Sequence, residues 1–309
     1  MNRWALLCSG QGCQSPEMFA RFDDEASQAL FRERIAPLPE GVAARFDPLS
    51  EEGLSRGEVA QPAMALYSEL AWKALRRAGL PLPDLLLGYS LGELNAMAVS
   101  GALPWEEWMP VAVERARLMA AAWGRPTALV ATLGLDRAAL AAIGAPFGAA
   151  VAIEIGPQHL IIGLERTHAA ALTEAALAAG ATTCRVLHVE VASHTPFLAA
   201  AGGPFGSVLE RCEWGRFAVP LLSATSLGLV RTRREAVKVA TAQLSGTVRW
   251  GEAMEAALER GITIFLELGP GRGLTKIARE LAPEAAARSL ADFQTFEGAV
   301  RWVEKQVGR

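Results

Sequence analysis

The segment Gly88-Tyr89-Ser90-Leu91-Gly92 constrains the fold more than any other part of the sequence, because a serine has glycine at both of its second neighbours. Glycine at these two positions lets a strand turn sharply into a helix and leaves the serine hydroxyl exposed at the bend. Residues 84–87 predict a short buried strand before the turn, and residues 91–99 predict an alanine-rich helix after it. The pattern predicts a nucleophile elbow in an α/β fold, with Ser90 as the nucleophile.

A second interpretation of the same residues is a helix cap. Ser90 and Glu93 match the S-x-x-E capping box, in which the serine only closes the start of the helix. A capping serine needs no glycine before it and is weakened by a glycine within the first turn, so the sequence favours the nucleophile. Free N–H groups at the start of the helix would also stabilise an oxyanion beside Ser90.

The 309 residues suffice for one large domain, or for a large domain that carries a smaller inserted one. Although 51% of the residues are hydrophobic, the apolar stretches are short, so we expect none to span a bilayer. The first eight residues predict a buried strand and not a signal peptide, so the expected location is the cytoplasm. The net charge of −3 argues against a nucleic-acid partner.

The cysteines predict no metal site. They form no C-x-x-C pair and lack histidine pairs at zinc-ligand spacing, so we expect buried or free thiols at Cys8, Cys13, Cys184 and Cys212.

Residues 126–190 have a different pattern from their flanks. Strand-like and helical segments alternate there in the order β-α-β-β-α-β, over residues 127–133, 136–143, 150–155, 160–164, 167–179 and 183–191. This order predicts a small ferredoxin-like domain inserted into a larger one. Residues 1–125 and 191–309 then form a large α/β-hydrolase-like domain, whose parallel sheet includes strands at 4–8, 85–88, 220–224 and 262–268.

Four histidines are candidates for the base that a serine nucleophile needs. His159 and His168 fall at ordinary surface positions, and His188 lies along a predicted strand. His194 lies in the loop where the chain returns from the small domain to the large one, and catalytic groups collect in such loops. With Ser90 as the nucleophile, the sequence predicts His194 as the general base.

Arg115 lies within an apolar stripe of the helix predicted to begin at Pro104. The stripe consists of Trp108, Val111, Ala112, Leu118, Met119 and Ala122. An unpaired buried charge is costly, and the planar guanidinium suits a carboxylate held by two hydrogen bonds. An internal salt bridge, or a guanidinium that reaches the helix end, is the alternative. Arg117 falls on the opposite side of the helix near Glu106, where we expect it to be solvated.

Three other segments give weaker signals. The loop Gly10-Gln11-Gly12 closes the first strand and can present backbone N–H groups to a ligand oxygen, and Gln61-Pro62-Ala63 predicts the start of a helix. A basic run predicts either a solvated face or a docking surface for an acidic partner. This basic run consists of Arg231, Arg233, Arg234 and Lys238.

Taken together, these motifs resemble the malonyl-CoA:acyl carrier protein transacylases. The resemblance covers nearly the whole chain in order, through Gly10-Gln11-Gly12-Cys13-Gln14, Gln61-Pro62-Ala63, residues 88–93, Arg115, Ser193-His194, residues 243–250 and Glu267-Leu268-Gly269-Pro270-Gly271. It implies a Ser90–His194 dyad, Arg115 as the ligand of the malonyl carboxylate, and an oxyanion hole from the N–H groups of Gln11 and Leu91. It also implies that Gln61 and Gln243 line the substrate site, and that no cofactor beyond the coenzyme A thioester and the carrier thiol is needed.

Three positions depart from the family pattern. Tyr89 stands where histidine commonly precedes the serine, which is similar to the transacylase subunit of malonate decarboxylase systems. Residues 155–159 replace an asparagine-rich turn, and Gly246-Thr247 replaces a frequent Asn-Pro. The first departure implies a malonate decarboxylase carrier subunit as the acceptor, with the carrier protein of fatty-acid or polyketide synthesis as the alternative.

Two other classes of function also share parts of the pattern. A serine hydrolase or thioesterase uses the same elbow, but usually has an Asp or Glu that orients its histidine and has no use for Arg115 among apolar residues. A non-catalytic protein that binds carriers would not need both Ser90 and His194.

Overall fold

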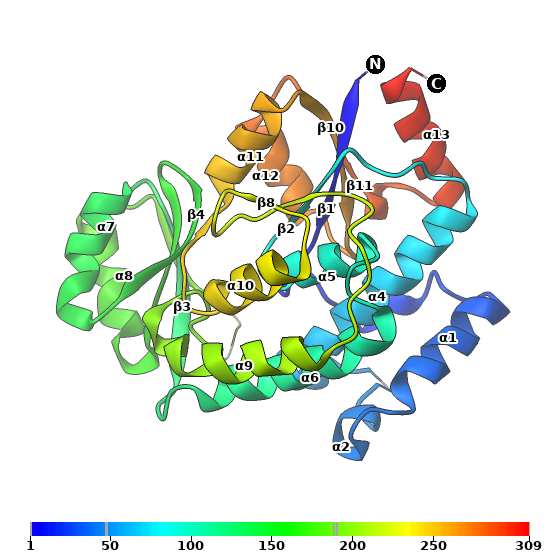
Figure 1. The fold of residues 1–309 in the computed structure, drawn as a ribbon. Helices are drawn as coiled ribbons and strands as arrows, with labels where there is room; N and C mark the ends of the chain where they lie inside the picture. The colour runs from blue at the N-terminus through cyan, green and yellow to red at the C-terminus, as the bar shows by residue number, and fades with distance from the viewer. Residues whose placement is uncertain (1, 47–48, 188, 190, 309) are drawn as a thin grey trace.

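Two β-sheets organise the chain, and helices cover both faces of the larger one (Figure 1). The computed structural model describes residues 2–46, 49–187, 189 and 191–308. The first strand, β1 (Arg3–Cys8), and the last helix, α13 (Phe296–Val307), lie near each other (Figure 1).

The large sheet brings the carboxyl ends of its central strands to one edge. Its order is β11 (Ala286–Ser289), β10 (Ile262–Leu268), β1 (Arg3–Cys8), β2 (Leu85–Gly88), β7 (Leu221–Leu222) and β8 (Leu229–Val230). All neighbours pair in parallel except β7 and β8. Cys8 is in register with both Leu268 and Gly88, so the loops after β1, β2 and β10 leave the sheet side by side. In open α/β sheets this edge is where ligands bind.

The helices pack in two layers because the side chains of each strand alternate between the faces. Leu6 of β1 belongs to the core under α4, α5, α6 and α9, whereas Ala5 and Leu7 face α11 and α12. The helices are α1 (Glu25–Ile35), α2 (Glu40–Ala43), α3 (Glu51–Ser55), α4 (Gly57–Arg77), α5 (Gly92–Val99), α6 (Trp105–Ala121), α7 (Arg137–Gly144), α8 (Ala169–Ala178), α9 (Ala199–Arg211), α10 (Arg233–Gln243), α11 (Trp250–Glu259), α12 (Gly273–Leu281) and α13 (Phe296–Val307). Short 3₁₀ turns occur at Pro16–Phe19, Ala145–Phe147, Arg166–His168, Pro196–Leu198 and Leu290–Asp292.

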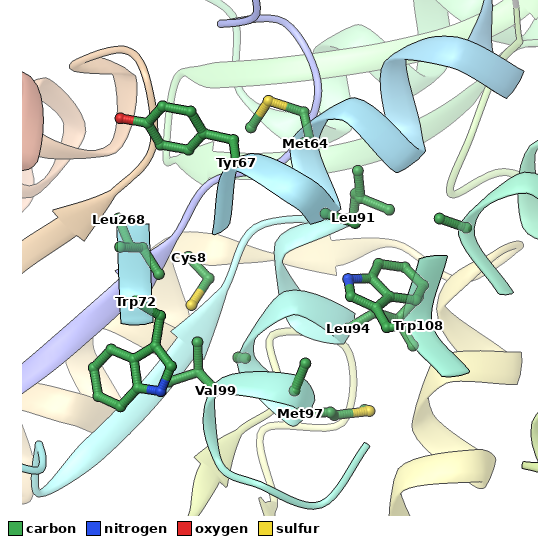
Figure 2. Packing of buried hydrophobic residues seen from close by; sticks show 14 of the residues in the cluster. Cys8, Met64, Tyr67, Trp72, Leu91, Leu94, Met97, Val99, Trp108 and Leu268 are labelled. Carbon is green, nitrogen blue, oxygen red and sulfur yellow. The ribbon is translucent and has the colours of Figure 1, made fainter. Parts of the chain in front are cut away.

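The helix that follows Ser90 is buried on all sides. Every residue of α5 is buried, and Figure 2 shows Leu94 of α5 beside Trp108 of α6 within the core. The indole Nε1 of Trp108 donates a hydrogen bond of 2.7 Å to Asn95 Oδ1, so the one polar group of this contact is satisfied. This packing gives Ser90 a rigid support.

The small sheet follows the β-α-β-β-α-β order that the sequence predicts. Its strands are arranged as β6 (Thr183–Val186), β3 (Thr127–Leu133), β5 (His159–Glu165), β4 (Ala150–Gly156) and β9 (Val248–Arg249). The first four pair in an antiparallel manner, and α7 and α8 cover one face with a separate core (Figure 1). The division of the chain into domains at residues 126–190 stays a prediction.

The structure differs from the sequence-based expectations at several elements. β9, from the segment after α10, pairs in parallel with β4 and extends the small sheet, and β11 was not expected at all. Helix α4 begins at Gly57, before the Gln61-Pro62-Ala63 segment, so Pro62 lies inside the helix. The strand expected over residues 183–191 ends at Val186, and His188 and Glu190 lie outside the described residues. No helix in the described part of the chain is long and apolar enough to cross a membrane.

Candidate active site

Ser90 lies in the sharp turn between β2 and α5, as the elbow motif predicts. Its φ of 56° is in the left-handed region, which is strained for a residue with a side chain and recurs at functional sites. Both flanking glycines are required by close packing, since a Cβ on Gly88 would lie 2.2 Å from Glu93 Cα and one on Gly92 would lie 1.9 Å from the Cys8 carbonyl oxygen. The motif therefore encodes the turn itself.

The capping-box interpretation of Ser90 is wrong. Helix α5 has Leu91 as its N-cap and no side-chain cap. The Ser90 hydroxyl instead lies 2.6 Å from His194 Nε2, and the carboxylate of Glu93 accepts a hydrogen bond from the Gln243 side chain. Both polar side chains of the proposed box therefore contact residues far away in the sequence.

His194 is the histidine that reaches Ser90, and two backbone contacts hold it there. Its ring Nδ1 donates to the carbonyl oxygen of Gln243 at 2.7 Å, and its backbone N–H donates to the carbonyl oxygen of Leu244 at 2.8 Å. A carbonyl oxygen can only accept, so the proton of the neutral ring is on Nδ1 and Nε2 is free to accept the Ser90 proton. A backbone carbonyl thus has the orienting role that an Asp or Glu has in the usual hydrolase triad.

Burial keeps His194 neutral. The side chain is 1% exposed, and removal from water lowers its pKa to about 4; the hydrogen bond to the Gln243 carbonyl opposes this shift, and the charge of Arg115 adds to it. At neutral pH the ring is therefore in the form that accepts a proton.

We expect this pKa to set the pH dependence of the reactivity of Ser90. The basic form of a histidine with a lowered pKa predominates above that value, so labelling by a fluorophosphonate, which modifies activated serines, should be constant between pH 6 and 8. It should fall only as the pH approaches about 4. A rate that is half-maximal near the ordinary histidine pKa of about 6.5 would contradict this account.

The other two histidines in the described ranges, His159 and His168, lie away from Ser90. His159 begins β5 of the small sheet, and the ring of His168 lies 3.3 Å from the carbonyl oxygen of Phe147. The expectation for His188 concerns a residue outside the described ranges.

Arg115 lies on the buried face of α6, as predicted, and is 1% exposed. Its Nη1 donates to Gln61 Oε1 of α4 at 2.9 Å, whereas its Nε and Nη2 have no hydrogen-bond partner in the part of the chain that the structure describes. Burial lowers the pKa of Arg115 to about 10, and the charge of Glu93 opposes this shift. Nε and Nη2 lie on one edge of the guanidinium and form the donor pair that a carboxylate accepts.

Arg117 is solvated, as expected. It pairs with Glu114 one helical turn away at 2.8 Å, while Glu106 pairs with Arg34. The ion pair with Glu114 is exposed, so it contributes little to stability.

Buried polar groups fix the loop after β1. The Ser9 hydroxyl donates to Glu267 Oε1 at 2.9 Å, and the Ser9 carbonyl accepts from Asn95 Nδ2 at 3.3 Å. These contacts place Gln11 at the cavity beside Ser90. Among the described residues, no acceptor is paired with the backbone N–H of Gln11 or of Leu91. Gln11 lines the cavity, whereas Leu91 is fully buried and is not among its lining residues, so an oxyanion hole from both N–H groups stays a prediction.

A cavity of about 390 Å³ lies between the edge of the large sheet and the small sheet. Ser90, His194, Gln11 and Gln61 line its polar side. Apolar residues of α3 and α6, among them Leu54 and Met119, also line the cavity. The small sheet and the segment after it add Leu129, Ile153, Ile161, Leu187 and Val189. Neither Gln243 nor Arg115 is among its lining residues in the described ranges, so Arg115 contacts the cavity wall through Gln61.

Gln243 does not line this cavity within the described ranges, so its expected place in the substrate site stays a prediction. Its side chain is directed to Glu93, and its contribution to the site is the carbonyl that holds His194. Nothing in the sequence marks this carbonyl, Glu93 was considered only as part of the capping box, and Asn95 and Glu267 had no predicted role. Glu93 and Glu267 belong to motifs that were recognised, but only their packing partners show what they do.

The basic run is exposed at the start of α10. Arg233 donates to the backbone carbonyl of Glu210, and Glu235 caps the helix in a capping box with Thr232. Arg233, Arg234, Val237, Lys238 and Glu210 surround a shallow hollow. Docking of an acidic partner on this face stays a prediction. The four cysteines are free, with Cys8 and Cys212 buried.

A parallel sheet with a serine in a sharp strand-to-helix turn and a histidine in contact with it is the arrangement found in enzymes that use a serine nucleophile. The family model for the acyl transferase domain matches residues 6–291. The chain belongs to this family and is an acyltransferase.

Similar proteins agree with this family. The chain is 25% identical over 314 residues to the malonyl CoA-acyl carrier protein transacylase of Bacillus subtilis, with 99% of each chain covered. It is 29% identical over 304 residues to the polyketide biosynthesis protein ThaF of Burkholderia thailandensis. The match covers 96% of this chain but only 26% of the length of ThaF. A malonyl-transacylase solved in complex with its type II PKS acyl-carrier protein has a TM-score of 0.91 and 25% identity, over 97% of this chain and 99% of that one.

Proposed function

We propose that this chain transfers a malonyl group from malonyl-CoA to the thiol of an acyl carrier protein, through a malonyl ester on Ser90. The observation that carries the proposal is the buried Arg115. Its Nε and Nη2 have no hydrogen-bond partner among the described residues, and its Nη1 donates to Gln61, which lines the same cavity as Ser90 and His194. A simple hydrolase of neutral esters has no use for such a cation, whereas an acyl group that ends in a carboxylate fits it.

The first half-reaction forms the ester. Ser90 Oγ attacks the thioester carbonyl carbon of malonyl-CoA while His194 Nε2 takes the hydroxyl proton. The N–H groups of Gln11 and Leu91 stabilise the tetrahedral oxyanion. When the intermediate collapses, the carbon–sulfur bond breaks and the coenzyme A sulfur receives the proton from His194.

The second half-reaction reverses these roles. The carrier thiol gives its proton to His194 Nε2 and attacks the ester carbonyl, and Ser90 leaves and recovers the proton. The product is a malonyl thioester on the carrier, and no redox step or further co-reactant is required.

The carrier protein of fatty-acid or polyketide synthesis is the better supported acceptor. The transacylase of Bacillus subtilis and the solved complex with a type II PKS acyl-carrier protein are both similar along nearly the whole chain. The malonate decarboxylase carrier rests on Tyr89 alone. The ring of Tyr89 packs edge-on against Trp250, with the centroids 5.2 Å apart, and burial raises the pKa of its hydroxyl. Neither the packing against Trp250 nor the burial of the Tyr89 hydroxyl distinguishes the two carriers.

Incubation with labelled malonyl-CoA tests the proposal. We expect label on Ser90 in the absence of a carrier and its transfer to a phosphopantetheinylated carrier added later. Rapid release of free malonate would indicate a hydrolase, and no labelling at all would indicate a binding protein. A parallel assay with the two kinds of carrier compares them as acceptors, and a strong preference for the decarboxylase carrier would reverse our assignment of the partner.

Arg115→Ala should change the acyl specificity as well as the rate. Only an acyl group with a free carboxylate gains the charge-assisted contact, which is worth roughly 1.5 to 3 kcal/mol, or about tenfold to a hundredfold in kcat/KM. We expect the rate of malonyl transfer to fall by about this factor. Acetyl transfer by the variant should then be as fast as malonyl transfer, or faster. Arg77→Ala, which removes an exposed arginine at the end of α4, is the matched control and should change neither rate. An equal loss with both acyl groups would make Arg115 structural.

A further inference from the structure

Glu93 is a buried carboxylate to which the proposed reaction assigns no role. It lies in the first turn of α5, one turn after Ser90, and is 1% exposed. Its Oε2 accepts a hydrogen bond from Gln243 Nε2, and its Oε1 has no partner within the described ranges. Because a buried carboxylate is costly, its presence here requires a reason beyond packing.

The Gln243 side chain connects this carboxylate to the base. Gln243 ends α10 and is itself 1% exposed. Its side-chain amide donates to Glu93, while its backbone carbonyl accepts the Nδ1 proton of His194 at 2.7 Å. The helix that carries the nucleophile is thus bonded, through one residue, to the group that fixes the tautomer and direction of the imidazole.

Ser90 and His194 belong to different segments, so their contact needs such a connection. His194 has a φ of 65° and takes its position from the end of α10, through Gln243 and Leu244. Movement of this end relative to α5 would change the 2.6 Å distance between Ser90 Oγ and His194 Nε2 directly. A misplacement of about 1 Å can cost about a hundredfold in rate.

We propose that Glu93 is a positioning residue that holds Gln243, and through it His194, in line with Ser90. The inference rests on the proposed function only in taking His194 as the base of Ser90, and it does not depend on which acyl group is transferred. Both ionisation states of Glu93 keep an oxygen that can accept from the Gln243 amide.

The surroundings of Glu93 fit this role. Burial raises its pKa to about 7, while the Ser223 hydroxyl, the hydrogen bond from Gln243 and the charge of Arg115 oppose the shift. Among the described residues, Glu93 therefore has a polar neighbour from the β7 end, a hydrogen-bond donor from α10 and a cation from α6. The Glu93 carboxylate lies where these elements meet, next to the residues that hold Ser90 and His194.

The rate at which a fluorophosphonate labels Ser90 measures the dyad without malonyl-CoA. Gln243→Met keeps the backbone carbonyl that His194 uses but removes the amide donor, and Glu93→Leu removes the acceptor. We expect the labelling rate of each variant to be about tenfold to a hundredfold lower than that of the wild type. The double variant should label at the same rate as the slower of the two single variants, because both substitutions break the same contact. Glu93→Gln, which offers an amide oxygen as acceptor, should restore most of the rate.

The His194→Ala background separates positioning from a general structural effect. If Glu93 and Gln243 act through His194, Gln243→Met should not slow labelling further when the imidazole is absent. Glu69→Gln is the control, because Glu69 is also a buried carboxylate but pairs with Arg34 and Lys73 far from Ser90, and it should label at the wild-type rate.

Two results would overturn the proposal: a wild-type labelling rate for Gln243→Met, or the same slowing with and without His194. If Glu93→Leu does not fold, the two Gln243→Met measurements decide alone. A wild-type protein that labels with the fluorophosphonate but forms no malonyl ester would reject the proposed substrate, while the labelling comparison would still decide the role of Glu93.

Discussion

Ser90→Ala should abolish formation of the malonyl-enzyme. The substitution removes the proposed attacking oxygen, and no other hydroxyl among the described residues is paired with the His194 ring. Intact-protein mass spectrometry after mixing with malonyl-CoA should show the adduct on the wild type and none on the variant. The free energy of unfolding should fall by about 1 kcal/mol or less, because one hydrogen bond and little packing are lost.

The matched control for this substitution is Ser207→Ala, at an exposed position of α9 whose hydroxyl contacts only the helix backbone. It should acquire the malonyl group like the wild type. A malonyl adduct that persists on Ser90→Ala would place the nucleophile at another residue.

His194→Ala should slow acylation by roughly 10² to 10⁴, the range attributed to general-base help. Nε2 of the ring lies 2.6 Å from the Ser90 hydroxyl, so the substitution removes the group placed to accept its proton. Rapid-quench measurement of the malonyl ester gives the rate constant directly. His168→Ala, on the surface of the small sheet, should react at the wild-type rate, and a near-normal rate for His194→Ala would remove it from the mechanism.

Most of the fold follows from local patterns in the sequence. The leucine run at 85–87 and the flanking glycines dictate a buried strand and a tight turn, and both occur where expected. The β-α-β-β-α-β order of the small sheet could likewise be predicted, because each element has its own periodicity. These signals depend only on neighbours along the chain.

The elements that escaped prediction lack such local signals. β9 spans only Val248–Arg249, and it becomes a strand because β4 offers an unpaired edge. Proline is common at the first position of a helix, which is why Gln61-Pro62-Ala63 predicts a helix start. Helix α4 instead begins at Gly57, so Pro62 lies more than one turn inside it. Tertiary packing of a long buried helix outweighs the single hydrogen bond that Pro62 cannot make.

The same limit applies to the candidate site. Ser90, His194 and Arg115 were identified because serine at an elbow, histidine in a junction loop and arginine on an apolar face are unusual as residue types. The carbonyl of Gln243 cannot be found in this way, since every residue has a carbonyl. The link from Glu93 to Gln243 joins positions 150 residues apart, and only the folded chain brings them together.

The central claim is that Ser90 carries a malonyl group on its way to a carrier thiol. The most direct test begins with the malonyl-enzyme made with labelled malonyl-CoA and freed of coenzyme A, to which one equivalent of phosphopantetheinylated acyl carrier protein is added. We expect label to leave Ser90 and to appear as a thioester on the carrier at the same rate, with Ser90 returned to its free form. Label that remains on Ser90, or that appears as free malonate at a rate independent of the carrier, would contradict it.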